Sequence, residues 1–287
     1  MKDRIDPLIA ERAPWMFHPS PLIRPIRGLF HLGLSYDKTI RIGERYKDAT
    51  TAELMGDLGR MLARNVEVTG LKNIPRSGPA MIVANHPTGI ADGIMLWHLL
   101  APIRPDLYIY ANRDILRVVP QMADVIAPVE WRQDKRSRGK TRETMEFTRT
   151  AVKDGRLGLI FPSGRLAKRR GLRLHEREWM ASAAMLARKF ELPVIPINIR
   201  ARNSVLFYLF DLIHPTLRDI TLFHETWNKV RQPYRITVGE EISPAALPAS
   251  SEEGIEMLRE ITLGLGGEPT VDMLKQSRRP KLGFSGS

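Results

Sequence analysis

The sequence predicts an α/β fold in which a central, mostly parallel or mixed sheet is flanked by helices and preceded by an N-terminal helical extension. Three short apolar runs, Ala80–Ala84, Leu157–Phe161 and Val194–Ile199, have the continuous hydrophobicity of strands that are buried on both faces. Segments with helical periodicity lie between them, as at Lys140–Lys153 and Trp179–Phe190. Buried strands that alternate with helices are typical of three-layer α/β domains.

In chain order, the 287 residues divide into three predicted regions. Residues 1–64 are expected to be helical and membrane-proximal, with an amphipathic helix at Thr51–Arg64. Within them, Pro14–Tyr36 mixes aromatic and aliphatic residues with Arg and His, a pattern typical either of a membrane-surface segment or of a helix packed on the domain. Residues 65–245 form the α/β domain, and residues 246–287 form a C-terminal helix (Glu252–Leu265) and a flexible tail.

The α/β domain has further expected elements. They are strands at Val66–Gly70, Leu107–Ala111 and Arg235–Val238, and a helix at Gly93–Leu100.

The composition is strongly basic and lacks cysteine. There are 44 Lys and Arg against 32 Asp and Glu, which gives a formal charge of +12. A disulfide framework, a cysteine nucleophile and a thiolate metal site are therefore excluded. The excess of base indicates an acidic partner: nucleic acid, an anionic membrane surface or an acidic substrate. Because no helix-turn-helix, zinc-finger or RNA-binding signature is present, nucleic acid is not expected to be the partner.

Membrane spanning is not predicted. The most apolar windows, Ser204–Ile213 and Leu192–Ile199, are shorter than the roughly 18–20 residues needed to cross a bilayer, and the first contains Asp211. The first eleven residues hold three acidic ones and no long apolar run, unlike a signal peptide. We therefore expect a cytoplasmic protein that is soluble or peripheral on the inner face of the membrane.

Several catalytic motifs are absent. Gly139-Lys140-Thr141 lacks the earlier glycine of a phosphate-binding loop, and neither His175-Glu176 nor His224-Glu225 is followed by the second histidine of a zinc-protease helix. The sequence contains no G-x-S-x-G elbow, and no G-x-G-x-x-G follows a predicted strand. No metal or cofactor is expected.

The strongest local signal is a histidine followed by an aspartate. His86 comes at the carboxyl end of a buried strand, and Asp92 comes six residues later, where a helix is expected to begin. Ligands collect at that edge of an open α/β sheet. An aspartate folded back on the histidine would fix its tautomer and prepare it as a general base for a hydroxyl or amine. The alternative is a turn histidine and a helix N-cap.

A second turn and two basic runs belong to the same predicted edge. Phe161–Arg165 follows a buried strand, and the backbone N–H groups of such a turn can hold an anion. Basic residues are frequent in Arg132–Arg142 and in Arg165–Arg177. Each run alone is typical of a solvated face, whereas two runs at one edge favour a phosphate-bearing ligand or lipid headgroups.

Together these motifs resemble the glycerolipid acyltransferases related to lysophosphatidic acid acyltransferase. That family combines N-H-x-x-x-x-D with a later F-P-E-G-[ST]-R and a V-I-P-V strand. The counterparts here are Asn85-His86 with Asp92, Phe161–Arg165, and Val194–Ile197. The five-residue spacer between His86 and Asp92, and the stretch Ile199–Ser204, are similar to the hemolysin-like bacterial branch of the family.

The resemblance implies the glycerolipid acyltransferase fold and acyl transfer from acyl-CoA or acyl-carrier protein to a lysolipid hydroxyl, such as that of 1-acylglycerol-3-phosphate or lyso-ornithine lipid, in membrane lipid biosynthesis. It implies that His86 is the base and that Asp92 orients it. It also implies that substrate is bound by Arg132, Ser163, Gly164 and Arg165. Ser163 stands where the family has Glu, which affects the acceptor more than the chemistry.

Two alternatives remain open at this point. The same base would serve an amine, so N-acyl transfer to an amino acid is one. The other is a catalytically inactive lipid-binding relative. The serine at position 163 favours this alternative, whereas the intact His86 and Asp92 argue against it.

Overall fold

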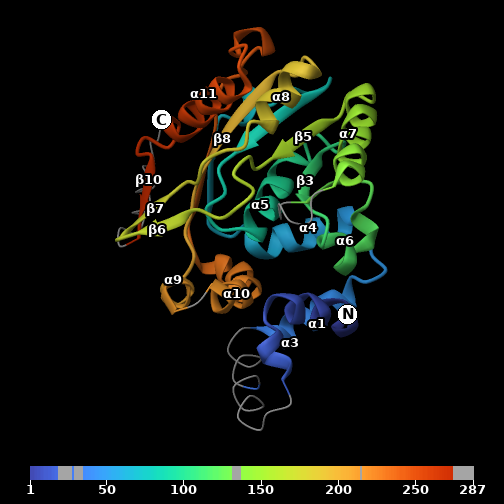
Figure 1. The fold of residues 1–287 in the computed structure, drawn as a ribbon, viewed down its shortest axis with the longest axis vertical. Helices are drawn as coiled ribbons and strands as arrows, with labels where there is room; N and C mark the ends of the chain where they lie inside the picture. Colours follow the sequence, from blue (N-terminus) through green and yellow to red (C-terminus); the bar gives the residue numbers. More distant parts are fainter. Residues whose placement is uncertain (19–27, 29–34, 131–136, 214, 274–287) are drawn as a thin grey trace, which may run out of the picture.

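The computed structural model describes residues 1–18, 28, 35–130, 137–213 and 215–273. Its centre is a seven-stranded sheet with the order β1-β9-β8-β2-β5-β3-β4 (Figure 1). The strands are β1 (Val66–Thr69), β2 (Ala80–Ala84), β3 (Tyr108–Asn112), β4 (Ile126–Val129), β5 (Leu157–Ile160), β8 (Val194–Arg200) and β9 (Tyr234–Val238). All neighbours in this sheet pair in parallel except β8 and β9, which are antiparallel. The mostly parallel, mixed sheet is therefore confirmed.

Helices cover both faces of the sheet. Side chains alternate along β2, so that Ala80, Ile82 and Ala84 pack with α4 (Thr51–Leu62) and α5 (Ile90–Leu100). Met81 and Val83 point the other way and pack with α7 (Arg138–Lys153), α8 (Ser182–Lys189) and α11 (Ser251–Gly264). Burial on both faces explains why β2 is a continuous apolar run.

Two helices begin three residues away from the start expected from the sequence. Helix α5 begins at Ile90 rather than at Gly93, because the Asp92 carboxylate accepts hydrogen bonds from the backbone N–H groups of Thr88 and Gly89 and so caps an earlier turn. Helix α8 begins at Ser182 rather than at Trp179. The preceding segment is held on the turn after β5, where Met180 N donates to Pro162 O at 3.0 Å.

A second, three-stranded antiparallel sheet was not expected. It contains β6 (Lys168–Arg170), β7 (Arg173–His175) and β10 (Thr270–Asp272), in the order β10-β7-β6. Part of the basic run Arg165–Arg177 is therefore a hairpin.

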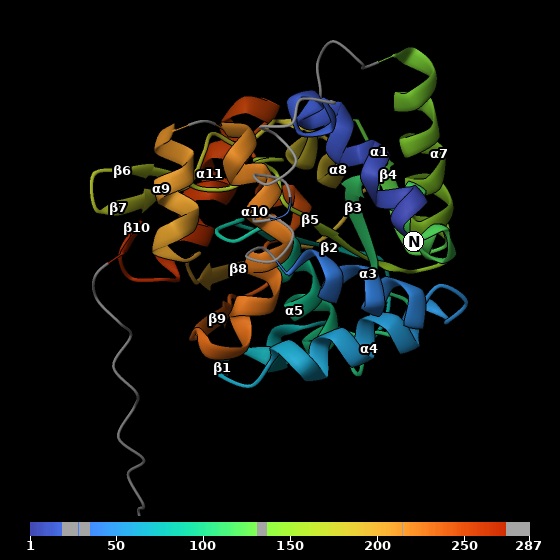
Figure 2. The ribbon, with the colours of Figure 1, turned by 90° about the horizontal axis from the view of Figure 1, so that it is seen from below.

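Helices gather at the end of the molecule to which the carboxyl ends of β2 and β8 point. They are α1 (Lys2–Arg12), α3 (Tyr36–Arg45), α9 (Val205–Ile213) and α10 (Pro215–Asn228), at the lower end of Figure 1, and Figure 2 views them from below. The short helix α6 (Ile115–Val118) contacts α1. Most of Pro14–Tyr36 and the tail after Met273 lie outside the described residues. In the part of the chain that the structure describes, no helix is both long and apolar enough to cross a membrane.

Candidate active site

The side chain of Asn85 fixes the point at which β2 leaves the sheet. Its Nδ2 donates to Ile199 O at 2.9 Å, and its Oδ1 accepts from Ile199 N at 2.7 Å. The amide therefore continues the pairing of β2 with β8 by one residue after the backbone of β2 has turned away. His86 follows directly and lies at the carboxyl end of the central strands, as expected.

His86 and Asp92 face each other. His86 Nδ1 lies 3.0 Å from Asp92 Oδ2, the Asp92 side chain is fully buried and that of His86 is 19% exposed. The ring of His86 stacks on Phe161, with 4.2 Å between centroids. The contact between Nδ1 and the carboxylate is close but does not have the geometry of a hydrogen bond. With Nδ1 turned to Asp92, Nε2 is the ring nitrogen left to accept a proton.

Both oxygens of the Asp92 carboxylate accept hydrogen bonds. Oδ2 accepts from the backbone N–H groups of Thr88 at 2.8 Å and Gly89 at 3.0 Å. Oδ1 accepts from Thr88 Oγ1 at 2.6 Å and from the Tyr234 hydroxyl at 3.2 Å. Gly89 has a φ of +94°, a conformation that L side chains rarely adopt, and a Cβ there would lie 2.9 Å from Leu166. Asp92 thus caps α5 and also faces His86. From the sequence, a helix cap and a partner of the histidine are alternatives, whereas in the structure the same carboxylate occupies both positions.

The turn Ser163–Arg165 lies beside His86. Ala167 N donates to His86 O at 3.0 Å, which ties the chain after the turn to the histidine. The buried Ser163 hydroxyl donates to Arg165 O at 2.8 Å, and Gly164 has a φ of +58°. The Arg165 side chain is exposed. The structure therefore brings three of the expected substrate-binding residues to the histidine, whereas the fourth, Arg132, lies outside the described residues.

Glu176 is a neighbour of His86 that the sequence analysis missed. Its Oε2 accepts from His86 N at 3.2 Å, and its Oε1 accepts from Trp179 Nε1 at 3.1 Å. Burial raises the pKa of Glu176, and this effect outweighs the hydrogen bonds from Trp179, Ser163 and the His86 backbone, which lower it. A buried carboxyl group therefore lies next to Ser163. The only signal in the sequence was the rejected pair His175-Glu176.

Arg177 lies next to the turn, and the charges of two further arginines affect its pKa. Arg177 Nε donates to Leu166 O at 2.9 Å. Partial burial lowers the pKa of Arg177, and the nearby positive charges of Arg165 and Arg218 lower it further. Arg218 also pairs with Asp211 at 2.9 Å. Arginines held close to one another beside a candidate base can bind a phosphate or a carboxylate.

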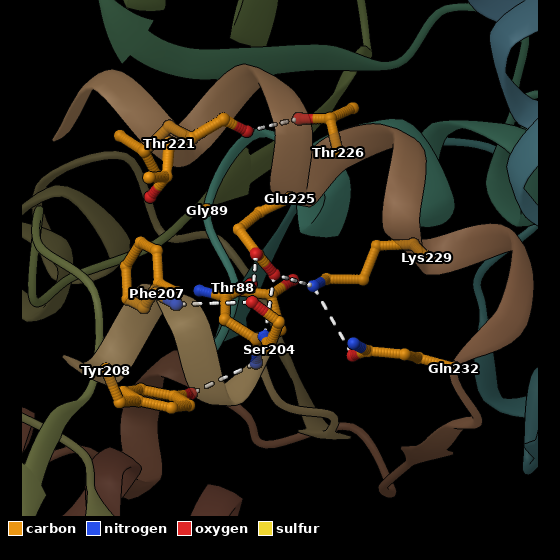
Figure 3. A network of polar contacts seen from close by, with 12 residues as sticks. Thr88, Gly89, Ser204, Phe207, Tyr208, Thr221, Glu225, Thr226, Lys229 and Gln232 are labelled. Carbon is orange, nitrogen blue, oxygen red and sulfur yellow. Dashed lines mark hydrogen bonds and ion pairs between the residues drawn. The ribbon is translucent and has the colours of Figure 1, made fainter. Parts of the chain in front are cut away.

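A buried ion pair holds the segment between β8 and α9. Lys229 Nζ lies 3.1 Å from Glu225 Oε2, and both side chains are at most 1% exposed. Glu225 also accepts from Ser204 N at 2.7 Å and from Ser204 Oγ at 2.5 Å. Burial lowers the pKa of Lys229, and the charges of Glu225 and Asp92 partly offset this. Figure 3 shows this network with Thr88 and Gly89.

The His86–Asp92 pair is the candidate centre of the site. Among residues 1–18, 28, 35–130, 137–213 and 215–273, no group of three His, Asp or Glu side chains is placed to hold a metal ion. A histidine paired with a buried carboxylate at the edge of a parallel sheet defines a site for general-base chemistry.

Comparison with known proteins finds a family match for residues 65–200. Residues 65–200 match the family model Acyltransferase. The fold is similar to that of the crystal structure of the 1-acyl-sn-glycerophosphate (LPA) acyltransferase, PlsC, from Thermotoga maritima. That likeness has a TM-score of 0.51 and 15% sequence identity, over 85% of this chain and 97% of the other. The resemblance to acyltransferases found in the sequence is therefore confirmed for residues 65–200, which match an acyltransferase domain.

Two curated relatives carry the same name, lyso-glycine lipid O-acyltransferase. The protein from Phocaeicola vulgatus is 25% identical over 147 residues, which is 51% of this chain and 51% of the relative. The protein from Bacteroides thetaiotaomicron is 21% identical over 206 residues, 71% of this chain and 72% of the relative. The match thus spans about half the length of the first relative and more of the second.

Proposed function

We propose that this protein transfers a fatty acyl chain from an acyl thioester to the hydroxyl group of a lysolipid. The observation that carries the proposal is the 3.0 Å contact between His86 Nδ1 and the buried Asp92 carboxylate. It supports an active enzyme over an inactive lipid-binding relative, because a buried carboxylate facing a partly exposed histidine prepares the second ring nitrogen as a base.

The reaction needs one base and no covalent enzyme intermediate. His86 Nε2 takes the proton of the acceptor hydroxyl as its oxygen attacks the thioester carbonyl carbon. The C–O ester bond forms, the C–S bond breaks, and the thiolate leaves and receives the proton from His86. Asp92 stabilises the imidazolium between these steps. A positioned base contributes about 10²–10⁴-fold to the rate. Backbone N–H groups of the turn Pro162–Arg165 would stabilise the oxyanion.

The acceptor is proposed to be an anionic lysolipid. The names of both relatives support transfer to oxygen and an amino-acid lipid as one acceptor. The guanidinium groups of Arg165 and Arg177 support an acidic headgroup, either a carboxylate or a phosphate as in 1-acylglycerol-3-phosphate. The donor is proposed to be acyl-CoA or acyl-carrier protein.

The place of action is proposed to be the anionic inner face of the membrane. The formal charge of +12 favours association with anionic lipid, and the acceptor itself is a lipid.

A product survey tests this function. The full chain is incubated with ¹³C-labelled acyl-CoA or labelled acyl-carrier protein and with three lysolipids: 1-acylglycerol-3-phosphate, a lyso-glycine lipid and a lysophosphatidylcholine as the zwitterionic control. Mass spectrometry is expected to find a labelled ester with at least one anionic acceptor and far less with the control. No labelled product with any donor and acceptor, or a labelled amide in place of an ester, would overturn the proposal.

A further inference from the structure

Helix α9 exposes a face made only of aliphatic side chains. Its exposed members are Val205 (74%), Leu206 (40%), Leu209 (50%), Leu212 (64%) and Ile213 (63%). At 3.6 residues per turn these positions fall on one continuous side of the helix. On the opposite side, Phe207 and Tyr208 are buried with Leu174 and Met273. The helix is therefore anchored by one face, and no element of the described residues covers the other.

The acidic residue in this apolar segment does not interrupt the exposed face. Asp211 lies on the protein side of α9, where its Oδ1 is 2.9 Å from Arg218 Nη1 and its side chain is 23% exposed. The ion pair with α10 neutralises Asp211. The outward face of α9 therefore carries no charge.

A basic hairpin borders α9. Leu174 of β7 packs with Phe207 and Tyr208, and both views of the ribbon place the β6–β7 hairpin next to α9 (Figures 1 and 2). The hairpin segment Lys168–Arg173 contains four basic residues and no acidic one. Leu172, at its turn, is 58% exposed. We call the five exposed aliphatic residues of α9, together with Lys168–Arg173, the α9 surface.

We propose that the α9 surface docks on an anionic lipid bilayer, with α9 lying along the interface. Aliphatic residues in a row beside cations are the arrangement of an interfacial helix, whose apolar face enters the acyl boundary while the cations meet anionic headgroups. Charge complementarity therefore selects anionic lipid as the occupant. From the sequence, a membrane contact of Pro14–Tyr36 is one of two open alternatives, and the described structure offers the α9 surface as a different candidate.

Docking through α9 would bring the candidate active site to the lipid. Leu222 of α10 packs in the same cluster as Phe207 and lies beside Gly89, in the loop that joins His86 to Asp92. A lysolipid acceptor would then reach His86 from the bilayer. This consequence rests on the proposed function, whereas binding to vesicles needs no turnover and is measured without an acyl donor.

The absence of cysteine makes a clean test possible. Leu209→Cys in the full chain is labelled with the fluorophore NBD and mixed with vesicles of phosphatidylcholine and phosphatidylglycerol. The emission is expected to shift to the blue and to be quenched by spin-labelled lipid. The matched control is Met185→Cys on α8, a residue of similar exposure (42%) whose label is expected to stay in water. α8 leads into β8 and so lies toward the opposite end of the sheet from His86.

Co-sedimentation gives the second readout. Leu209→Gln is expected to lower the partition coefficient for anionic vesicles about tenfold, the effect of losing one buried leucine, whereas Met185→Gln leaves it unchanged. The double variant Arg170→Gln/Arg173→Gln is also expected to have a lower partition coefficient for anionic vesicles. Added salt is expected to remove the difference between this variant and the parent protein. A label at position 209 that stays in water with vesicles would overturn the proposal. So would one that is buried without vesicles in a concentration-dependent way, because α9 would then join two copies of the chain.

Discussion

The Tyr234 hydroxyl donates a hydrogen bond to Asp92 Oδ1 at 3.2 Å, although the two residues are 142 positions apart in the chain. Tyr234 begins β9, and Asp92 lies in the first turn of α5. The Thr88 hydroxyl contacts both groups. Because Asp92 is fully buried, these hydroxyls replace water around the carboxylate and fix the oxygen that faces away from His86. The orientation of the candidate base therefore depends on a distant strand.

Tyr234→Phe tests this positioning role. Removal of the hydroxyl leaves the buried carboxylate short of one donor, so we expect kcat to fall about tenfold with little change in KM and stability to fall by about 1 kcal/mol. The control is Tyr110→Phe, which loses a buried hydrogen bond to Thr148 of 2.9 Å. Equal kcat values in the two variants would show that Tyr234 only stabilises the fold.

Arg177→Gln tests the headgroup site. The positive charge of Arg165 acts on Arg177, so we expect both to attract an anionic headgroup. Loss of Arg177 is then expected to raise KM for an anionic lysolipid about tenfold and to leave kcat within about twofold. Steady-state kinetics with an anionic and a zwitterionic acceptor measure the difference. Arg149→Gln, on the exposed face of α7, serves as the control. A KM for the anionic acceptor that is the same in Arg177→Gln as in the parent contradicts this assignment.

The raised pKa of Glu176 predicts how the stability of the protein depends on pH. Because burial raises the pKa of Glu176 above its ordinary value of 4.5, the folded state keeps this proton to a higher pH than the unfolded state does. The parent protein therefore loses stability as the pH rises through that window, whereas Glu176→Gln does not titrate. Urea unfolding at pH 4.5 and pH 7 is expected to show that the free energy of unfolding of the variant, relative to that of the parent, is higher at pH 7 than at pH 4.5. A difference in stability between Glu176→Gln and the parent protein that is independent of pH would refute the argument.

The buried pair of Glu225 and Lys229 makes a prediction about stability (Figure 3). Lys229→Met leaves the Glu225 carboxylate buried without its cation, and we expect a loss of about 3–5 kcal/mol in the free energy of unfolding. Lys229→Met/Glu225→Gln removes both charges and is expected to lose less. Denaturant unfolding measures both. A double variant that is as unstable as the sum of the single ones would show that the charges do not interact.

The parts of the fold that the sequence predicted are those set by local pattern. The apolar run of β2 and the position of His86 just after it follow from a strand buried on both faces. The pairing of His86 with Asp92 could also be expected, because a short loop with a glycine at φ +94° joins them.

The parts that were missed depend on contacts between distant segments. Tyr234 was placed before the expected strand Arg235–Val238, and nothing near it in the sequence indicates that it reaches Asp92. The strands β6 and β7 are short, and β6 is Lys-Arg-Arg, without the alternation of apolar residues that predicts a strand. Pairing of β7 with β10, about 100 residues later, completes that small sheet.

Loss of acyl transfer in His86→Ala is the most direct test of the proposed chemistry. The full-length variant is assayed with a labelled acyl thioester and the preferred lysolipid, after circular dichroism and thermal unfolding have shown that it is folded. Since Nε2 of His86 is the only proposed acceptor for the hydroxyl proton, turnover is expected to fall at least a hundredfold. Turnover within a few-fold of the parent protein would contradict the assignment of His86 as the base.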